Sequence, residues 1–214
     1  MKIIGITGAS GAGKSEARKV FELYGIKSID TDKISREVTA KNSECLKELA
    51  EYFSSDILTD NGELDRKKLA GIAFSSAENL KMLNKITHKH IINKCNEIIT
   101  EMKNAGEKAV IIDAPLLFES GFNTRCDVII SVVSDLDKKI ERIIKRDNIT
   151  EEQAKIRIQN QKSDEFLREN SDFVIYNNSD YAKLISQGTK IHNILFGEKT
   201  DQSTPFSFSL PSCA

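Results

Sequence analysis

The sequence lacks the features that mark several classes of protein. It has no tryptophan, so an aromatic surface that stacks on a ligand would need one of its 4 tyrosines or 10 phenylalanines. Its formal net charge of −1 argues against a nucleic-acid partner, because such partners usually require a strongly basic surface. No apolar run approaches the length of a membrane span, and the chain enters its first expected strand at Lys2 without a signal sequence. We therefore expect a cytoplasmic protein that binds neither nucleic acid nor membrane.

The cysteines also exclude two kinds of site. Cys45, Cys95, Cys126 and Cys213 are scattered, and no two form a C-x-x-C pair. This spacing fits neither a disulfide framework nor a zinc site, so we expect reduced thiols. The 214 residues are 39% hydrophobic and 29% charged, which is enough for one sizeable α/β core with an insertion.

A glycine-rich segment near the N-terminus carries the strongest chemical signal. Residues 8–15 read Gly-Ala-Ser-Gly-Ala-Gly-Lys-Ser, which is the G-x-x-x-x-G-K-S/T pattern of a phosphate-binding loop. A buried strand is expected at residues 2–7 and an amphipathic helix at residues 16–23. Glycines let backbone N–H groups approach phosphate oxygens, Lys14 would reach the terminal phosphates, and the Ser15 hydroxyl would ligate Mg²⁺. We expect a nucleotide to contact Gly8, Ser10, Gly11, Ala12, Gly13, Lys14, Ser15 and Glu16.

Two carboxylates follow the second expected strand. Residues 26–30 read as this strand, and Asp30, Asp32 and Arg36 come at or just after its end. Ligands of open α/β sheets bind beyond the carboxyl ends of the strands, which favours a catalytic or binding role. The alternative is that Asp32 caps the next helix. Alternation along a strand would point Asp30 and Asp32 the same way, so position alone does not choose between them.

A helical block interrupts the strands at residues 41–105. Its longest pattern runs from residue 77 to about residue 102, and the whole block is typical of an acceptor-binding insertion. His88 and His90 lie within it, but a spacing of two puts them on different helix faces, which argues against a shared metal site. A single helical histidine is more often structural than ligand-binding.

Strands return after the insertion. Residues 108–113 form a nearly all-apolar strand that ends in Asp113, in the manner of a Walker-B aspartate that orients the Mg²⁺ shell. Further strands are expected at residues 126–133 and 171–178, followed by a helix at 182–196. Residues 197–214 have no periodicity and are expected to form a flexible tail.

Two helices between the fourth and fifth strands are basic. Lys139, Arg142 and Arg146 share one face of the first, and Thr150 with Gln153 forms a capping box that begins the second. This hairpin would suit a lid whose arginines neutralise charge during phosphoryl transfer. The alternative is a solvated charged surface.

Together these stretches resemble the dephospho-coenzyme A kinase family over residues 2–196. The resemblance is carried by residues 8–15, Asp30-Thr31-Asp32 with Arg36, Leu64-Asp65-Arg66, Leu83-Asn84 with His88, the run Asp-Ala-Pro-Leu-Leu-Phe-Glu at 113–119, Arg142 with Arg146-Asp147, Gln161, and Asn177-Asn178.

The resemblance implies an α/β P-loop kinase fold with a five-stranded parallel sheet flanked by helices. Its single domain would span residues 1–196, with a core (1–33, 107–134, 170–196), a helical acceptor-binding insertion (about 34–106) and a helical lid (about 135–169). The implied reaction transfers the γ-phosphoryl of ATP, with Mg²⁺, to the ribose 3′-hydroxyl of dephospho-CoA, which is the last step of coenzyme A synthesis. A monomer or small homo-oligomer is expected.

The resemblance also implies roles for individual residues. Asp32 would be the general base, with Lys14 and Arg142 as the other catalytic residues. Arg142 and Arg146 would contact phosphates, and Asn177 would lie near the adenine of ATP. The acceptor site would be formed by Asp32, Arg36, His88, Asp113, Leu116, Leu117 and Phe118.

The sequence departs from the family pattern most visibly at Glu16, where a threonine is usual. The carboxylate adds negative charge beside the phosphates, so weaker ATP binding is expected. Lys89, Ser171 and Tyr176 are smaller departures. Two other functions compete: another small-molecule or nucleoside monophosphate kinase, and a regulatory GTPase. A regulatory GTPase would carry an N-K-x-D motif and a D-x-x-G after the third strand. This sequence has neither, which argues against the second function.

Overall fold

The computed structural model describes residues 1–197. The tail expected at 197–214, and Cys213 within it, lie outside the described residues except for Gly197. This glycine ends the last helix in a left-handed conformation with φ 72°. Within residues 1–197, no helix combines the length and the apolar character needed to cross a membrane.

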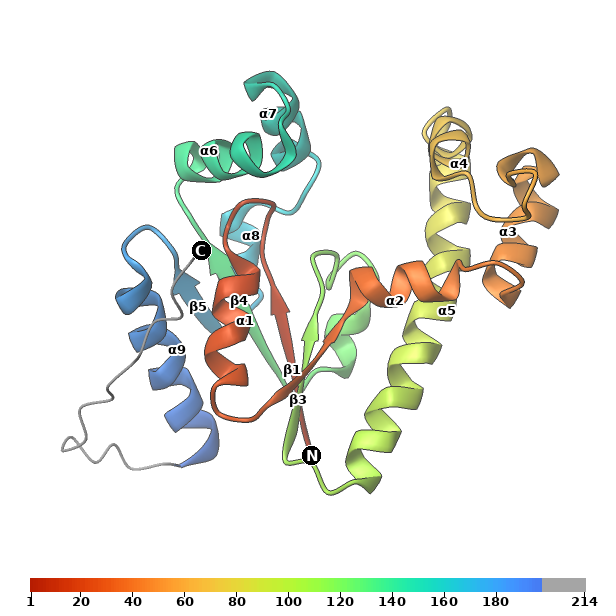
Figure 1. Ribbon diagram of the computed structural model, residues 1–214. Coiled ribbons are helices and arrows are strands. Elements are labelled where there is room, and N and C mark those ends of the chain that lie inside the picture. The colour runs from red at the N-terminus through yellow and green to blue at the C-terminus, as the bar shows by residue number, and fades with distance from the viewer. Residues whose placement is uncertain (198–214) are drawn as a thin grey trace, which may run out of the picture.

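The described residues contain a five-stranded sheet in which every neighbouring pair is parallel, in the order β2-β3-β1-β4-β5 (Figure 1). The strands are β1 (Lys2–Thr7), β2 (Lys27–Asp30), β3 (Ala109–Asp113), β4 (Val128–Val133) and β5 (Phe173–Tyr176). The inner strand β3, between β2 and β1, is buried along its whole length, as expected for a nearly all-apolar strand of a parallel sheet. The five-stranded parallel sheet predicted from the sequence is therefore confirmed.

Helices connect the strands. They are α1 (Lys14–Glu22), α2 (Thr31–Val38), α3 (Glu44–Phe53), α4 (Arg66–Ala73), α5 (Ala77–Asn104), α6 (Leu136–Asp147), α7 (Glu151–Gln159), α8 (Asp164–Glu169) and α9 (Tyr181–Phe196). Two short 3₁₀ turns are η1 (Ser55–Ile57) and η2 (Phe122–Arg125). The predicted capping box of Thr150 and Gln153 starts α7, with both of its hydrogen bonds formed.

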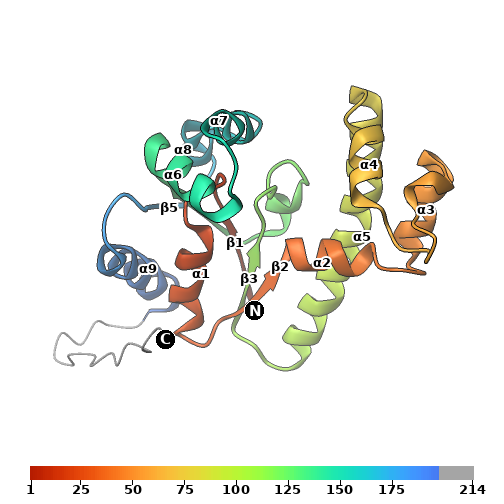
Figure 2. The ribbon, with the colours of Figure 1, turned by 45° about the horizontal axis from the view of Figure 1, so that its top comes forward.

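The helices cover both faces of the sheet (Figures 1 and 2). On one face, α1 and α9 pack on the sheet through a cluster that includes Phe21, Ile130 and Leu184. The two helices approach closely, since a Cβ on Gly188 would lie 2.7 Å from Cγ1 of Val20. On the other face, α5 contributes Cys95 to a second cluster with Leu117 and Phe122. The sheet thus forms the middle of three layers.

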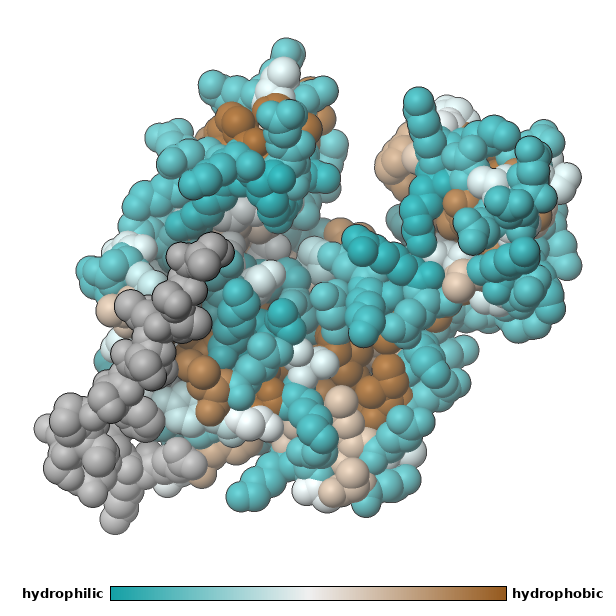
Figure 3. Space-filling view, in the orientation of Figure 1, coloured by the Kyte–Doolittle hydropathy of each residue, from teal (hydrophilic) through white to brown (hydrophobic). Residues whose placement is uncertain are grey.

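The two additions to this core have small apolar clusters of their own. The insertion is held together by Cys45, Leu49, Phe53, Ile57, Leu69 and Ile86. The hairpin of α6 and α7 is held together by Ile140, Ile143 and Ala154. The space-filling view shows a hollow between the α6–α7 hairpin and the end of the insertion that carries α3 and α4 (Figure 3).

The described cysteines are free, as the sequence predicts. Burial raises the pKa of Cys45 and Cys95 to about 11 and that of Cys126 to about 12. These thiols are therefore protonated near neutral pH, which makes them poor nucleophiles and poor metal ligands.

Candidate active site

The glycine-rich loop at residues 8–15 joins β1 to α1 and requires glycine at two positions. Gly11 has φ 77° and Gly13 has φ 91°, values that side chains other than glycine rarely adopt. A Cβ on Gly11 would lie 2.4 Å from the carbonyl oxygen of Lys139, and one on Gly13 would lie 2.0 Å from Nδ2 of Asn177. The loop is therefore packed directly against α6 and against the end of β5.

A cavity of about 790 Å³ opens above this loop. The loop, the α6–α7 hairpin and the segment after β3 all contribute to its wall, so it lies at the carboxyl ends of the strands, as expected for this class of fold. We call it the donor cavity. It is lined by Gly8, Ala9, Ser10, Gly11, Gly13, Lys14, Ser15, Glu16, Asp32, Pro115, Leu116, Arg142, Arg146, Arg157, Gln161, Asn177, Tyr181 and Leu184.

Ala12 differs from its neighbours in the loop. Its side chain is fully buried and does not line the donor cavity, although a nucleotide contact was expected there. Its carbonyl oxygen instead accepts a hydrogen bond of 2.9 Å from Nδ2 of Asn177. Ala12 therefore helps to attach the loop to the end of β5.

The ammonium of Lys14 is ion-paired with the carboxylate of Asp113, which is 3% exposed at the end of β3. Nε of Arg18 lies 3.0 Å from Oδ2 of the same carboxylate, although without hydrogen-bond alignment. Asp113 pairs in the sheet with both Ile6 and Asp30, so it lies at the common edge of β1, β2 and β3. Asp113 was expected at the acceptor site. It lines neither the donor cavity nor the second cavity, which is described below. The structure places it beneath the loop.

Arg142 of α6 is bound to the backbone around the loop. Its guanidinium donates to the carbonyl of Gly11 at 3.0 Å, to Oγ of Ser134 at 3.1 Å and to the carbonyl of Asn177 at 2.9 Å. The sequence predicted that Arg142 reaches in from a lid. The structure places it in the wall of the donor cavity, among the contacts that join α6 to the loop and to β5.

The basic face predicted on α6 is divided by the fold. Lys139 is 5% exposed and pairs with Asp164 of α8 at 2.9 Å, so it does not line the donor cavity. Although the spacing puts Lys139 on the same helix face as Arg142 and Arg146, only the two arginines line the donor cavity. The neighbours of Lys139 could not reveal this, because Asp164 is 25 residues away in the sequence.

The end of α6 and the helix α7 bring two arginines to the donor cavity. Arg146 and Arg157 both line it, and both pair with Asp147. The hydrogen bond from Arg146, followed by the contact with Arg157, holds the pKa of Asp147 at about 2, so this carboxylate stays charged. The hydrogen bond to Asp147 raises the pKa of Arg146, and the negative charge of Glu16, at the start of α1, adds a smaller contribution. Glu16 and Arg146 both line the donor cavity.

The segment after α7 touches the loop. The backbone N–H of Ser10 donates to Oε1 of Gln161 at 2.8 Å. The ring of Phe118, from the segment after β3, packs edge-on against Phe166 of α8 with centroids 5.2 Å apart. These contacts place the base of the α7–α8 connection directly beside the loop.

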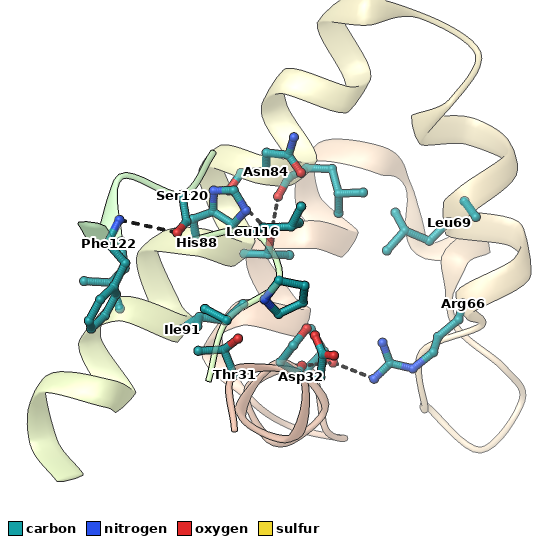
Figure 4. A pocket seen from close by; sticks show the side chains of 18 of the residues that line it. Thr31, Asp32, Arg66, Leu69, Asn84, His88, Ile91, Leu116, Ser120 and Phe122 are labelled. Carbon is teal, nitrogen blue, oxygen red and sulfur yellow. Dashed lines mark hydrogen bonds between the residues drawn. The ribbon is translucent and has the colours of Figure 1, made fainter. Parts of the chain in front are cut away.

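A second cavity, of about 280 Å³, adjoins the first, and we call it the acceptor cavity (Figure 4). Helices α2, α4 and α5 and the segment after β3 form its walls. It shares Asp32, Pro115 and Leu116 with the donor cavity. Its remaining lining residues are Thr31, Ser35, Thr39, Leu64, Arg66, Leu69, Ala70, Phe74, Leu83, Asn84, Thr87, His88, Ile91, Ile92, Ala114, Ser120 and Phe122.

Of the two carboxylates after β2, Asp30 is the helix cap. Its side chain accepts hydrogen bonds from the N–H groups of Asp32 and Lys33 at 2.9 and 3.1 Å, which satisfies two unpaired donors at the start of α2. The suggestion that Asp32 caps this helix is therefore wrong. Strand alternation does not apply to Asp32, because β2 ends at Asp30 and the helix begins at Thr31. The exposed carboxylate of Asp32 is free to face both cavities.

The surroundings of Asp32 raise its pKa above the ordinary aspartate value. Loss of solvation against the surrounding protein is the largest cause, although the side chain remains exposed at the mouth of the cavities. Lys14 and Arg36 oppose the rise, while the negative charges of Asp30 and Asp113 add to it. An aspartate with a raised pKa is a better proton acceptor than an ordinary one.

Comparison with known proteins identifies the family. The model of the dephospho-CoA kinase family matches residues 2–183. A dephospho-CoA kinase of Fusobacterium nucleatum is 41% identical over 185 residues, which are 86% of this chain and 94% of that protein. One of Corynebacterium glutamicum is 33% identical over 188 residues, which are 88% of this chain and 94% of that protein. The chain belongs to the dephospho-CoA kinase family.

Solved structures agree with this family assignment. A dephospho-CoA kinase of Campylobacter jejuni superposes with a TM-score of 0.68 at 30% identity and covers 92% of this chain and 99% of its own. A protein of Thermus thermophilus superposes with a TM-score of 0.80 at 25% identity, with 91% and 97% coverage. A shikimate kinase of Acinetobacter baumannii, at 14% identity and a TM-score of 0.51 with 94% and 96% coverage, shares the fold alone. The P-loop kinase fold and ATP as the co-substrate follow from the family.

The structure separates the residues that the family resemblance assigned to the acceptor site. Asp32, His88 and Leu116 line the acceptor cavity, and burial lowers the pKa of His88, so its imidazole tends to be neutral. Leu117 is fully buried in the core cluster on the α5 face of the sheet. Phe118 packs on α8 instead.

Two further residues of α2 and α5 lie away from the acceptor cavity. Arg36 is exposed one turn after Asp32 and acts on it through its charge, but it lines neither cavity. His90 pairs with Glu48 of α3 at 2.8 Å, which gives it a structural place in the insertion.

The sequence assigned no role to Arg66 of α4 or to Phe74, which directly follows this helix, yet both line the acceptor cavity. Arg66 was within reach, since it belongs to the quoted family run Leu64-Asp65-Arg66. Phe74 had no signal of its own, because an exposed phenylalanine at a helix end is common in any sequence. Both acquire a role through the packing of α4 against α5.

Glu16→Thr is expected to lower the KM for ATP by roughly fivefold, which corresponds to removing ~1 kcal/mol of repulsion between partly solvated charges. Glu16→Gln should give most of the same gain if charge is the cause, and the gain should shrink at high salt. Steady-state kinetics with varied ATP measure this. Glu141→Thr, which changes an exposed glutamate of α6 outside the donor cavity, is the matched control. An unchanged KM in both Glu16 variants would retire the idea.

Proposed function

We propose that this protein transfers the γ-phosphoryl of ATP to the ribose 3′-hydroxyl of dephospho-CoA, giving coenzyme A and ADP. One observation carries the proposal: the donor and acceptor cavities adjoin, and the carboxylate of Asp32 belongs to both. A hydroxyl bound in the acceptor cavity beside Asp32 would therefore face a phosphate held in the donor cavity. Positioning of this kind supplies most of the catalysis in phosphoryl transfer.

The loop would bind the phosphates of ATP through its backbone N–H groups, and the ammonium of Lys14 would contact the terminal phosphates. For this, the Lys14 ammonium would leave Asp113. The free-energy cost of this move is small, because Arg18 remains paired with Asp113 and the buried carboxylate keeps a cation beside it. Arg146 and Arg157 face the same cavity and would neutralise charge as the phosphoryl moves. The α7 region, attached to the loop through Gln161, would close over the nucleotide as a lid.

Asp32 would accept the proton of the attacking hydroxyl. Its raised pKa brings it closer to the operating pH, and Asp30, as helix cap, fixes the start of the helix that carries it. In a loose transition state the proton leaves late, so Asp32 would also orient the hydroxyl toward phosphorus. Asn177, at the end of β5, would lie near the adenine.

Mg²⁺ fits the residues present. This ion usually takes one or two protein oxygens and otherwise phosphate and water oxygens. The exposed hydroxyl of Ser15 lines the donor cavity beside Lys14 and would supply such an oxygen. No group of three or more His, Cys, Asp or Glu side chains within residues 1–197 is arranged to hold a metal by itself, so the phosphates would complete the shell. When bound, the ion would neutralise phosphate charge.

We also propose a cytoplasmic location, which the free thiols of Cys45, Cys95 and Cys126 support. A monomer or small homo-oligomer is compatible with both cavities, since residues of a single chain line each of them.

The function is tested with a panel of acceptors. Purified protein with Mg-ATP and dephospho-CoA is expected to release ADP and form coenzyme A in equal amounts, measured by coupled ADP release and mass spectrometry. Shikimate, gluconate and nucleoside monophosphates serve as competing acceptors, and GTP serves as a competing donor. Reactions without an acceptor give the ATPase background. Release of ADP with another acceptor but not with dephospho-CoA would show that the substrate is wrong.

A further inference from the structure

Arg66 is the only lysine or arginine among the described residues that lines the acceptor cavity. It begins α4 and points into the cavity from the side opposite His88 (Figure 4). Its guanidinium has no carboxylate partner within residues 1–197. Because His88 tends to be neutral, Arg66 is the permanent positive charge of this cavity.

A buried hydroxyl holds Arg66 in place. Thr39, 4% exposed at the end of α2, accepts a hydrogen bond of 2.9 Å from Nη2 of Arg66 and donates one of 2.7 Å to the carbonyl of Ser35. The other N–H groups of the guanidinium have no protein partner within the described residues. Arginine offers five donors in a planar fork that matches phosphate oxygens. The side chain is thus oriented while most of its donors remain available to an anion.

The rest of the cavity shows where that anion would lie. Asp32, at the border with the donor cavity, is the only carboxylate among the lining residues. It repels anions, so an anionic part of a ligand is favoured at the Arg66 wall instead. Leu64, Leu69 and Phe74 belong to the same lining and offer apolar surface to the rest of a ligand. The cavity thus combines one carboxylate, one permanent cation and apolar surface.

We propose that Arg66 binds the diphosphate of the acceptor and that Thr39 holds its guanidinium for this purpose. The inference rests on the proposed function. Dephospho-CoA carries its diphosphate between the ribose and an uncharged arm, and Arg66 is the permanent cation that the acceptor cavity offers to this diphosphate. Arg36, which the sequence had assigned to the acceptor, lines neither cavity.

Arg66→Met tests the proposal, since methionine keeps part of the stem and removes the charge. We expect the KM for dephospho-CoA to rise by ~10- to 100-fold, as for the loss of a charge-assisted hydrogen bond. The kcat and the KM for ATP should stay within about twofold, because the diphosphate is remote from the bond being formed. The KM of Arg66→Lys for dephospho-CoA should lie between that of the wild type and that of Arg66→Met. Thr39→Val should raise the KM for dephospho-CoA by a smaller factor than Arg66→Met does. Adding Thr39→Val to Arg66→Met should raise this KM little further.

The controls separate this inference from the proposed function. Lys67→Met removes the neighbouring exposed cation of α4, which does not line the cavity, and should leave every constant near the wild-type value. If wild-type protein does not phosphorylate dephospho-CoA, the proposed function fails. If it does, and Arg66→Met leaves the KM for dephospho-CoA unchanged, only the inference on Arg66 fails. A fall in kcat together with comparable rises in both KM values and a lowered Tm would show that the role of Arg66 is purely structural. That result would overturn the inference.

Discussion

Asp32→Asn is expected to lower kcat by ~10²- to 10⁴-fold while leaving the affinity for ATP nearly unchanged. Asparagine has almost the same size as aspartate but cannot take up the proton of the acceptor hydroxyl. ATP binding should survive because the loop and Lys14, not Asp32, would hold the phosphates. Single-turnover kinetics with dephospho-CoA give the rate, and calorimetric titration with a non-hydrolysable ATP analogue gives the affinity.

Asp30→Asn is the matched control for Asp32. Its amide oxygen can still accept the capping hydrogen bonds of α2, so the helix should keep its start. Most of the activity should remain. A loss in Asp30→Asn as large as that in Asp32→Asn would move the proton-accepting role, or the requirement for charge, to Asp30.

The raised pKa of Asp32 gives this prediction a pH dependence. Asp32 accepts a proton only when ionised, so kcat should fall as the pH falls through a pKa that lies above the ordinary aspartate value. Asp30→Asn removes one of the negative charges that raise this pKa, so the acid limb should move to lower pH. An acid limb that stays in place would show that another group controls it.

The same shift has a consequence for stability. Because the folded protein binds the Asp32 proton more tightly than the unfolded chain does, ionised Asp32 destabilises the fold at pH values above its folded pKa. Asp32→Asn should therefore raise the Tm near neutral pH. The difference should vanish below the ordinary aspartate pKa, where both states of the wild type are protonated. Thermal unfolding at several pH values measures it.

Lys14→Met is expected to lower kcat/KM for ATP by ~10³-fold or more, because it removes the cation that would follow the transferring phosphoryl. Both nucleotide affinity and turnover should fall, unlike in Asp32→Asn. Lys19→Met changes an exposed lysine of the same helix that does not line the donor cavity, and it should behave as the wild type. Near-normal kinetics in Lys14→Met would mean that the loop is not the donor site.

The structure also predicts that Lys14→Met folds. The variant leaves the buried carboxylate of Asp113 beside Arg18, so it does not create an unpaired buried charge. Its Tm should stay close to that of the wild type, which lets the kinetic loss be assigned to Lys14 itself. Calorimetry checks this.

The segment Pro115-Leu116-Leu117-Phe118 shows how far a sequence pattern reaches. The run is typical of the family, and the resemblance assigned Leu116, Leu117 and Phe118 to a single site, the acceptor site. The fold places these three residues in three different environments. Leu116 is 43% exposed where the two cavities meet, Leu117 is fully buried in the core, and Phe118 packs on Phe166 of α8. Consecutive side chains leave a loop in different directions, and only the surrounding elements decide what each one meets.

The sequence by itself determined the parts of this protein that depend on neighbouring residues. The loop at residues 8–15, the apolar strand before Asp113 and the capping box at Thr150 are local patterns, because glycine conformation, strand burial and helix capping act over a few residues. Tertiary structure alone decided which polar groups meet. Thr39 holds Arg66 across 27 residues, and Lys139 pairs with Asp164 across 25. Such pairings follow from how helices pack, and the order of the residues in the chain does not encode them locally.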